Sequence, residues 1–130
     1  MVRKQKTALG LTSLFFLLIA FLTLAPVSPP TGYGATDKTY HMLAFAGLAL
    51  PIATLQPRWL LFMIPVFAIF GGAIELIQPY FGRSCDFADW IADVKGIMIG
   101  SIVGLVLCLG IRRMKIARNL KVQSILKIHM

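Results

Sequence analysis

Four apolar stretches, each about 20 residues long, determine what this chain can fold into. They cover roughly residues 8–27, 36–55, 59–78 and 90–111. An α-helix needs about 20 mostly apolar residues to cross the hydrocarbon core of a bilayer. Only 14% of the residues are charged and 58% are hydrophobic, which excludes a soluble domain with a surface of mixed charge. We therefore predict an all-α, integral membrane four-helix bundle.

The positive charge of the chain lies mainly at its two ends. Nine of the thirteen Lys and Arg residues flank the apolar region, three before the first stretch and six after the last. Cytoplasmic segments of membrane proteins are enriched in Lys and Arg, so both termini are predicted to be cytoplasmic, which agrees with an even number of spans. The formal net charge of +8 therefore requires no nucleic acid as a partner.

This charge distribution also predicts the domain organisation. Residues 1–7 form a basic cytoplasmic N-terminus, residues 8–111 the four-span transmembrane domain, and residues 112–130 a basic cytoplasmic tail. The tail is expected to be either an amphipathic helix on anionic lipid or a disordered segment.

All five acidic residues fall on the side of the membrane opposite to the termini. They are Asp37 at the start of the second stretch, Glu75 near the end of the third, and Asp86, Asp89 and Asp93 at the start of the fourth. Helical rise places Glu75 and Asp93 each about 4 to 5 Å below the outer interface, and His41 in the same layer. Charged side chains on a lipid-facing surface are costly, so these groups are predicted to turn toward one another.

The fourth stretch also carries a regular stripe of acidic and small residues. Asp86, Asp89, Asp93, Gly96, Gly100 and Gly104 follow at intervals of 3, 4, 3, 4 and 4, which puts all six on one side of a helix. The glycine part is typical of close helix–helix packing. It predicts packing against a neighbouring helix and leaves open a homo-oligomer formed through the same stripe.

Three segments, DKTYHMLAF (37–45), ELIQ (75–78) and DWIADVKGIMIG (89–100), together with Arg83, resemble the VanZ-like family of small bacterial membrane proteins over about residues 35–105. The matching positions are Asp37, Lys38, His41, Glu75, Gln78, Arg83, Asp89, Gly96 and Gly100. Asp93 stands where many members carry Asn, and Met42 where an aromatic residue is common. The resemblance implies a multi-pass protein of the bacterial cytoplasmic membrane. The family's named member is associated with resistance to the glycopeptide antibiotic teicoplanin.

From these residues we expect a cell-envelope protein that binds or handles a polar or phosphorylated lipid, or a lipid-linked envelope precursor, at the outer membrane face. Arg and Lys side chains suit phosphate, so Arg83, Lys38 and protonated His41 are expected to hold it. The full set of predicted ligand-binding residues is Asp37, Lys38, His41, Glu75, Gln78, Arg83, Asp86, Asp89 and Asp93. This prediction includes no cofactor and no resident metal ion.

Three other interpretations of the same residues stay open. The first is a metal-assisted hydrolase or phosphatase acting on an envelope lipid, with oxygen-rich ligands for Mg²⁺, Mn²⁺ or Zn²⁺ from Glu75, Asp89, Asp93 and His41. The second is a structural membrane protein whose charged side chains form a buried ion-pair network. The third is proton or ion movement, which the sequence favours least, because no acidic residue continues the path toward the inner face.

Overall fold

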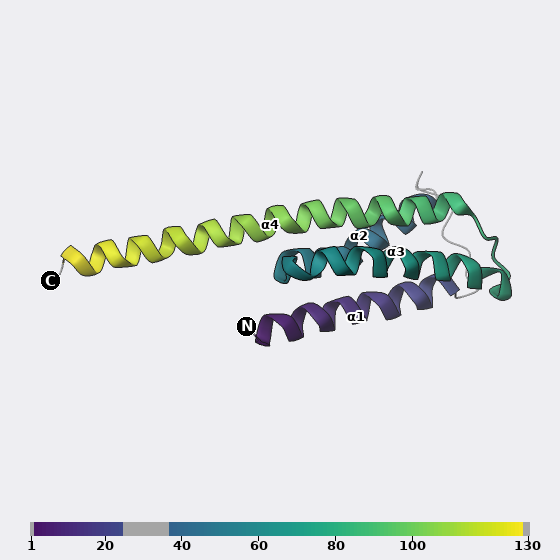
Figure 1. The fold of residues 1–130 in the computed structure, drawn as a ribbon, viewed down its shortest axis with the longest axis horizontal. Helices are drawn as coiled ribbons and strands as arrows, with labels where there is room; N and C mark the ends of the chain where they lie inside the picture. Colours follow the sequence, from purple (N-terminus) through teal and green to yellow (C-terminus); the bar gives the residue numbers. More distant parts are fainter. Residues whose placement is uncertain (1, 25–36, 129–130) are drawn as a thin grey trace.

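The computed structural model describes residues 2–24 and 37–128, and the regular elements in these two ranges are all helices (Figure 1). They are α1 (Val2–Leu24), α2 (Asp37–Leu55), η1 (Pro57–Trp59), α3 (Leu60–Ile77), η2 (Gln78–Phe81) and α4 (Phe87–Ile128). The prediction of an all-α fold is confirmed. The Pro and Gly residues between positions 26 and 36 predict an extended connection, and this segment lies outside the described residues. The four long helices run alongside one another, and the N- and C-terminal ends point the same way (Figure 1).

Three parts of the described chain are long and apolar enough to cross a membrane. They are Val2–Leu24, Pro57–Phe81 and Phe87–Lys127, which indicates a helical membrane protein. Helix α2 does not meet this criterion, because its first five residues, DKTYH, are all polar. Hydropathy therefore does not show that α2 is a fourth membrane-spanning helix.

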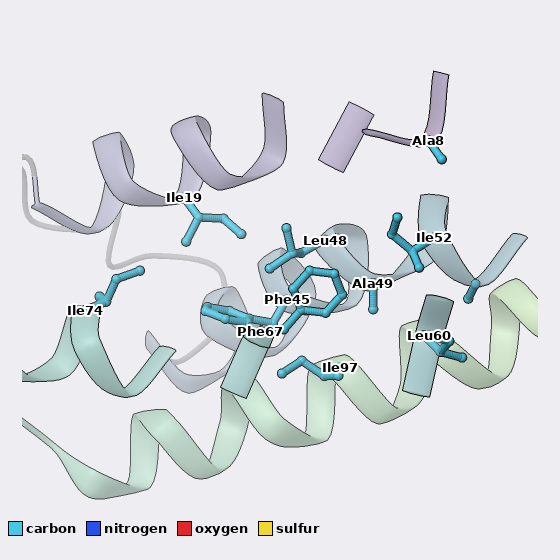
Figure 2. Packing of buried hydrophobic residues seen from close by; sticks show 11 residues of the cluster. Ala8, Ile19, Phe45, Leu48, Ala49, Ile52, Leu60, Phe67, Ile74 and Ile97 are labelled. Carbon is cyan, nitrogen blue, oxygen red and sulfur yellow. The ribbon is translucent and has the colours of Figure 1, made fainter. Parts of the chain in front are cut away.

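Helix α2 is nevertheless the central element of the packing, since it lies against α1, α3 and α4. Its side chains Phe45, Leu48 and Ile52 follow at intervals of three and four residues, and all three are fully buried. Figure 2 shows Phe45 beside Phe67 of α3, with Leu48 and Ile97 nearby. A helix covered on several sides by protein can carry polar residues at one end without exposing them to lipid.

Aromatic contacts connect the first three helices around this core. The ring of Phe16 on α1 lies 4.5 Å from that of Phe70 on α3, in an edge-to-face arrangement, and 5.7 Å from that of Phe67. Phe45 of α2 lies 5.9 Å from Phe70. Ring pairs at these distances are favourable beyond the area that they bury, which matters in lipid because apolar burial alone does not drive helices together.

The glycine stripe of α4 packs against α2. A Cβ atom at Gly96 or Gly100 would overlap the backbone carbonyl groups of Met42 and Ala46, respectively, and one at Gly104 would overlap the side chain of Ala53. The two helices therefore approach with almost no side chain between their backbones. Within the chain, α2 covers this glycine surface. A homo-oligomer formed through the stripe stays a prediction.

Helix α4 continues far past the bundle. It has 42 residues, or about 63 Å of helix at 1.5 Å per residue, and residues 109–127 are exposed (Figure 1). The chain has no Pro or Gly after Gly110, so nothing in the sequence ends the helix there. Cations and apolar residues share its faces, since Ile116 and Lys127 are eleven residues, and so about 20°, apart around the axis. The tail thus joins α4 as a helix without a separate apolar face.

Candidate functional site

The nine predicted ligand-binding residues all lie at one end of the bundle, and we call this set the polar cluster. Its members come from the start of α2 (Asp37, Lys38, His41), the end of α3 and η2 (Glu75, Gln78), the following loop (Arg83, Asp86) and the start of α4 (Asp89, Asp93). Eight of them form a hydrogen bond or an ion pair with another member of the set, and Gln78 is buried one turn beyond Glu75. The cluster has an outer layer of ion pairs and a buried inner group.

The outer layer uses both of its cations in ion pairs. Arg83 Nη2 lies 3.0 Å from Asp37 Oδ2. Lys38 Nζ lies 2.9 Å from Asp86 Oδ2 and 3.2 Å from Asp89 Oδ1. These pairs connect α2 with the loop and with α4. Both side chains that were expected to hold a phosphate thus contact carboxylates, and phosphate binding by them stays a prediction.

Arg83 also reaches the first helix. Its Nη1 donates a hydrogen bond of 3.4 Å to the backbone carbonyl of Thr23, near the end of α1. One side chain therefore contacts both α1 and α2 from the loop that precedes α4. The guanidinium group, with five N–H donors in a fixed plane, is suited to bonding two acceptors at once.

Asp86 caps the first turn of α4. Its side chain accepts a hydrogen bond of 2.9 Å from the amide of Ala88, and its backbone carbonyl accepts one of the same length from the amide of Asp89. A carboxylate at this position satisfies amides that have no partner within the helix. The hydrogen bond from Lys38, followed by the bond from the Ala88 amide, lowers the pKa of Asp86 below its ordinary value. Asp86 is therefore ionised at neutral pH.

The inner group consists of His41, Glu75 and Asp93, which we call the buried triad. Their side chains are 3%, 5% and 0% exposed. His41 Nδ1 lies 2.9 Å from Asp93 Oδ1 and 3.9 Å from Glu75 Oε1. The second oxygen of Glu75 accepts a hydrogen bond of 3.1 Å from the amide of Asp86, which fixes the carboxylate against the loop. Three helices thus bring one imidazole and two carboxylates together.

Some polar atoms at this end remain unsatisfied. Within residues 2–24 and 37–128, Glu75 Oε1, Asp93 Oδ2 and Gln78 Nε2 are buried and have no hydrogen-bond partner. A buried polar atom without a partner costs about 1 to 3 kcal/mol, and more if it is charged. Such atoms in native proteins call for an explanation, such as a bound ligand, ion or water.

Two neighbours of Asp93 were not identified as site residues from sequence. Asp93 packs against Gly71 of α3, where a Cβ atom would lie 2.7 Å from Asp93 Oδ2, so the absence of a side chain there makes room for the carboxylate. Trp90, three residues before Asp93, donates a hydrogen bond of 2.9 Å from Nε1 to the carbonyl of Ala68 and joins α4 to α3. Gly71 could have been identified from sequence, because it lies one helical turn before Glu75.

A groove of about 390 Å³ lies beside the polar cluster, between α2 and α4. It is lined by Lys38, Thr39, Met42, Ala88, Ile91, Ala92 and Lys95. Lys95 is exposed and forms no ion pair with any described residue. The groove thus combines two lysines with an otherwise mostly apolar wall. The groove forms because of the way α2 and α4 pack, and no sequence pattern specifies this packing.

Comparison of the chain with protein-family models, with curated proteins and with solved structures finds no match to any of them.

Proposed function

We propose that this chain is a VanZ-like integral membrane protein of the bacterial cell envelope that binds the anionic head group of a lipid, or of a lipid-linked envelope precursor, at the outer membrane face. The observation that carries the proposal is the groove between α2 and α4, with Lys38 and Lys95 beside apolar side chains. Lysines near a membrane surface attract anionic lipids. A groove with charged and apolar parts suits a phosphate and the start of an acyl or prenyl chain.

Lys95 is the better candidate for the primary contact. Lys38 is held by Asp86 and Asp89, so an anion must compete with two carboxylates for its ammonium group. Lys95 has no such competitor in the described part of the chain, and its long stem can move its charge along the groove. This assignment replaces the expected phosphate contact with Arg83, whose partner is Asp37.

The proposed topology has four spans, with both termini in the cytoplasm. Three helices are apolar enough to cross a membrane, and α2 lies among them as the central packing element. The terminal cations favour a cytoplasmic position for both ends. The polar cluster and the groove then face the cell exterior, in a bacterial cytoplasmic membrane.

Native mass spectrometry of the detergent-purified full chain tests lipid binding. The protein is supplied with phosphatidylglycerol, which is anionic, or with phosphatidylcholine, which is zwitterionic, and the fraction of protein that retains lipid is measured. We expect preferential retention of phosphatidylglycerol. The variant Lys95→Gln should lose about 1 kcal/mol of binding free energy, or about fivefold in affinity.

Lys121→Gln is the matched control, because Lys121 is also exposed on α4 but lies beyond the bundle. It removes the same charge and should retain phosphatidylglycerol as the wild type does. Equal loss in both variants would show that overall charge, and not the groove, attracts the lipid. Equal retention in all three proteins would favour the alternative that the polar cluster is a structural ion-pair network.

A further inference from the structure

The buried triad has a charge that its surroundings do not balance. Arg83 lies in an ion pair with Asp37, and Lys38 with Asp86 and Asp89. Among the described residues, no Lys or Arg lies within ion-pair distance of Glu75 or Asp93, and their ion-pair partner is His41. Two carboxylates that are almost fully buried are expensive unless positive charge compensates them.

The orientation of the carboxylates points to where that positive charge would lie. Glu75 Oε1 has no hydrogen-bond partner in the described chain, yet it is turned toward His41, with 3.9 Å between Oε1 and Nδ1. Asp93 contacts His41 through Oδ1, and its Oδ2 is also unsatisfied. Glu75 therefore directs an unpartnered oxygen atom at the same imidazole that Asp93 contacts, and all three side chains are almost inaccessible.

The spacing of the donor atoms fits a metal ion. One donor atom from each triad residue lies within 4.8 Å of the other two. Ligands about 2.0 to 2.2 Å from a tetrahedral zinc ion are roughly 3.3 to 3.5 Å from one another. The observed distances from His41 Nδ1, 2.9 Å to Asp93 and 3.9 Å to Glu75, lie on either side of that value. Each of these two distances would therefore have to change by about half an ångström to match a tetrahedral site.

We propose that His41, Glu75 and Asp93 form a binding site for one divalent transition-metal ion such as Zn²⁺. One imidazole and two carboxylates suit zinc or manganese better than magnesium, which prefers oxygen ligands alone. The two negative charges balance a dication. This inference goes beyond lipid binding, because no triad residue lines the groove.

The test is zinc binding by the full chain in detergent after treatment with a chelator. Zinc is added alone, and its stoichiometry and affinity are measured by native mass spectrometry and calorimetry. We expect one zinc ion per chain in the wild type. Each of His41→Ala, Glu75→Gln and Asp93→Asn removes one of three protein ligands and should weaken binding at least tenfold.

Two controls separate the triad from other ligands. Cys85→Ser removes the exposed thiol, and His129→Ala removes the only other histidine of the sequence. Both should bind zinc as the wild type does, as should Lys95→Gln, which tests the groove separately. Absence of zinc from the wild type, undiminished binding by the triad variants, or an equal loss in the two controls would each overturn the proposal.

Folding is monitored in the same experiment through the thermal midpoint. Glu75→Gln is the most conservative triad variant, since the amide oxygen can still accept the hydrogen bond from the Asp86 amide. Zinc should raise the midpoint of the wild type more than that of Glu75→Gln, because weaker binding gives less stabilisation at the same zinc concentration. An equal increase in both proteins would assign the zinc to another place and contradict the proposed site.

Discussion

Replacing Gly100 by Ala should separate α4 from α2. The added Cβ atom would lie 2.8 Å from both the carbonyl carbon and the Cα of Ala46, where ordinary contact begins at 3.4 Å, and closer still to the carbonyl oxygen. These are backbone atoms, so no side-chain rotation can relieve the overlap. The helices must therefore part by about 0.6 Å, the difference between 3.4 and 2.8 Å, or more. Overpacking of this kind costs about 1 to 3 kcal/mol.

Gly110→Ala is the matched control on the same helix. A Cβ atom at Gly110 meets nothing within 4 Å, so this variant keeps the packing and gains helix propensity, by about 1 kcal/mol in water. Gly100→Ala has the same propensity gain and the added clash. The two variants should therefore differ by about 1 to 3 kcal/mol in the free energy of unfolding, the size of the clash alone.

The assay is unfolding of each protein in mixed micelles with increasing denaturing detergent, followed by tryptophan fluorescence. Trp90 reports on the α3–α4 contact through its hydrogen bond to Ala68. Gly100→Ala should unfold at a lower denaturant fraction than the wild type, and Gly110→Ala at the same or a higher one. Equal midpoints for the two variants would refute the claim that α2 and α4 meet backbone to backbone at the glycine stripe.

Two further predictions concern the loop before α4. In intact cells, a membrane-impermeant maleimide should label exposed Cys85 but not buried Cys108, and labelling of Cys85 only after permeabilisation would contradict the proposed topology. Asp86 has a lowered pKa in the folded protein, so its stabilising contribution is complete above its ordinary value of 3.8 and disappears as the pH falls through the lower folded value. Unfolding midpoints measured from pH 6 to pH 2.5 should therefore decrease less in Asp86→Asn than in the wild type, and parallel curves would exclude this linkage.

Sequence periodicity predicts much of the architecture, because each polar residue is placed within its own helix by a fixed rise and rotation. It puts His41, Glu75 and Asp93 in one layer, and the structure has them in contact range. It also puts Asp89 and Asp93 on one side of α4. Properties internal to one helix can therefore be derived from the order of its residues.

Pairing between helices could not be derived in the same way. Lys38 contacts Asp86 and Asp89, and Arg83 contacts Asp37, but an exchange of these partners would fit the sequence equally well. The choice depends on helix rotations and separations of about an ångström, which packing determines. Lys95 illustrates the same limit, because its place in the groove depends on the separation of α2 and α4.

The length of α4 was also beyond the sequence prediction. The apolar stretch ends near residue 111. Helix propensity depends on the residue type, and Lys and Arg favour a helix about as well as Leu does, so propensity does not fall where hydropathy falls. The basic segment therefore continues the helix to Ile128.

The polar cluster also fixes how α2 is turned about its own axis. Apolar side chains in a lipid environment give weak orientational preference, since one hydrophobic face packs nearly as well as another. Asp37 contacts Arg83 in the loop, Lys38 contacts Asp86 in the loop and Asp89 at the start of α4, and His41 contacts Asp93 one turn deeper in α4. A rotation of α2 by one residue, about 100°, would break all three sets of contacts together. The ion pairs and hydrogen bonds of the polar cluster therefore determine a single rotational orientation of α2, and its apolar remainder contributes close packing.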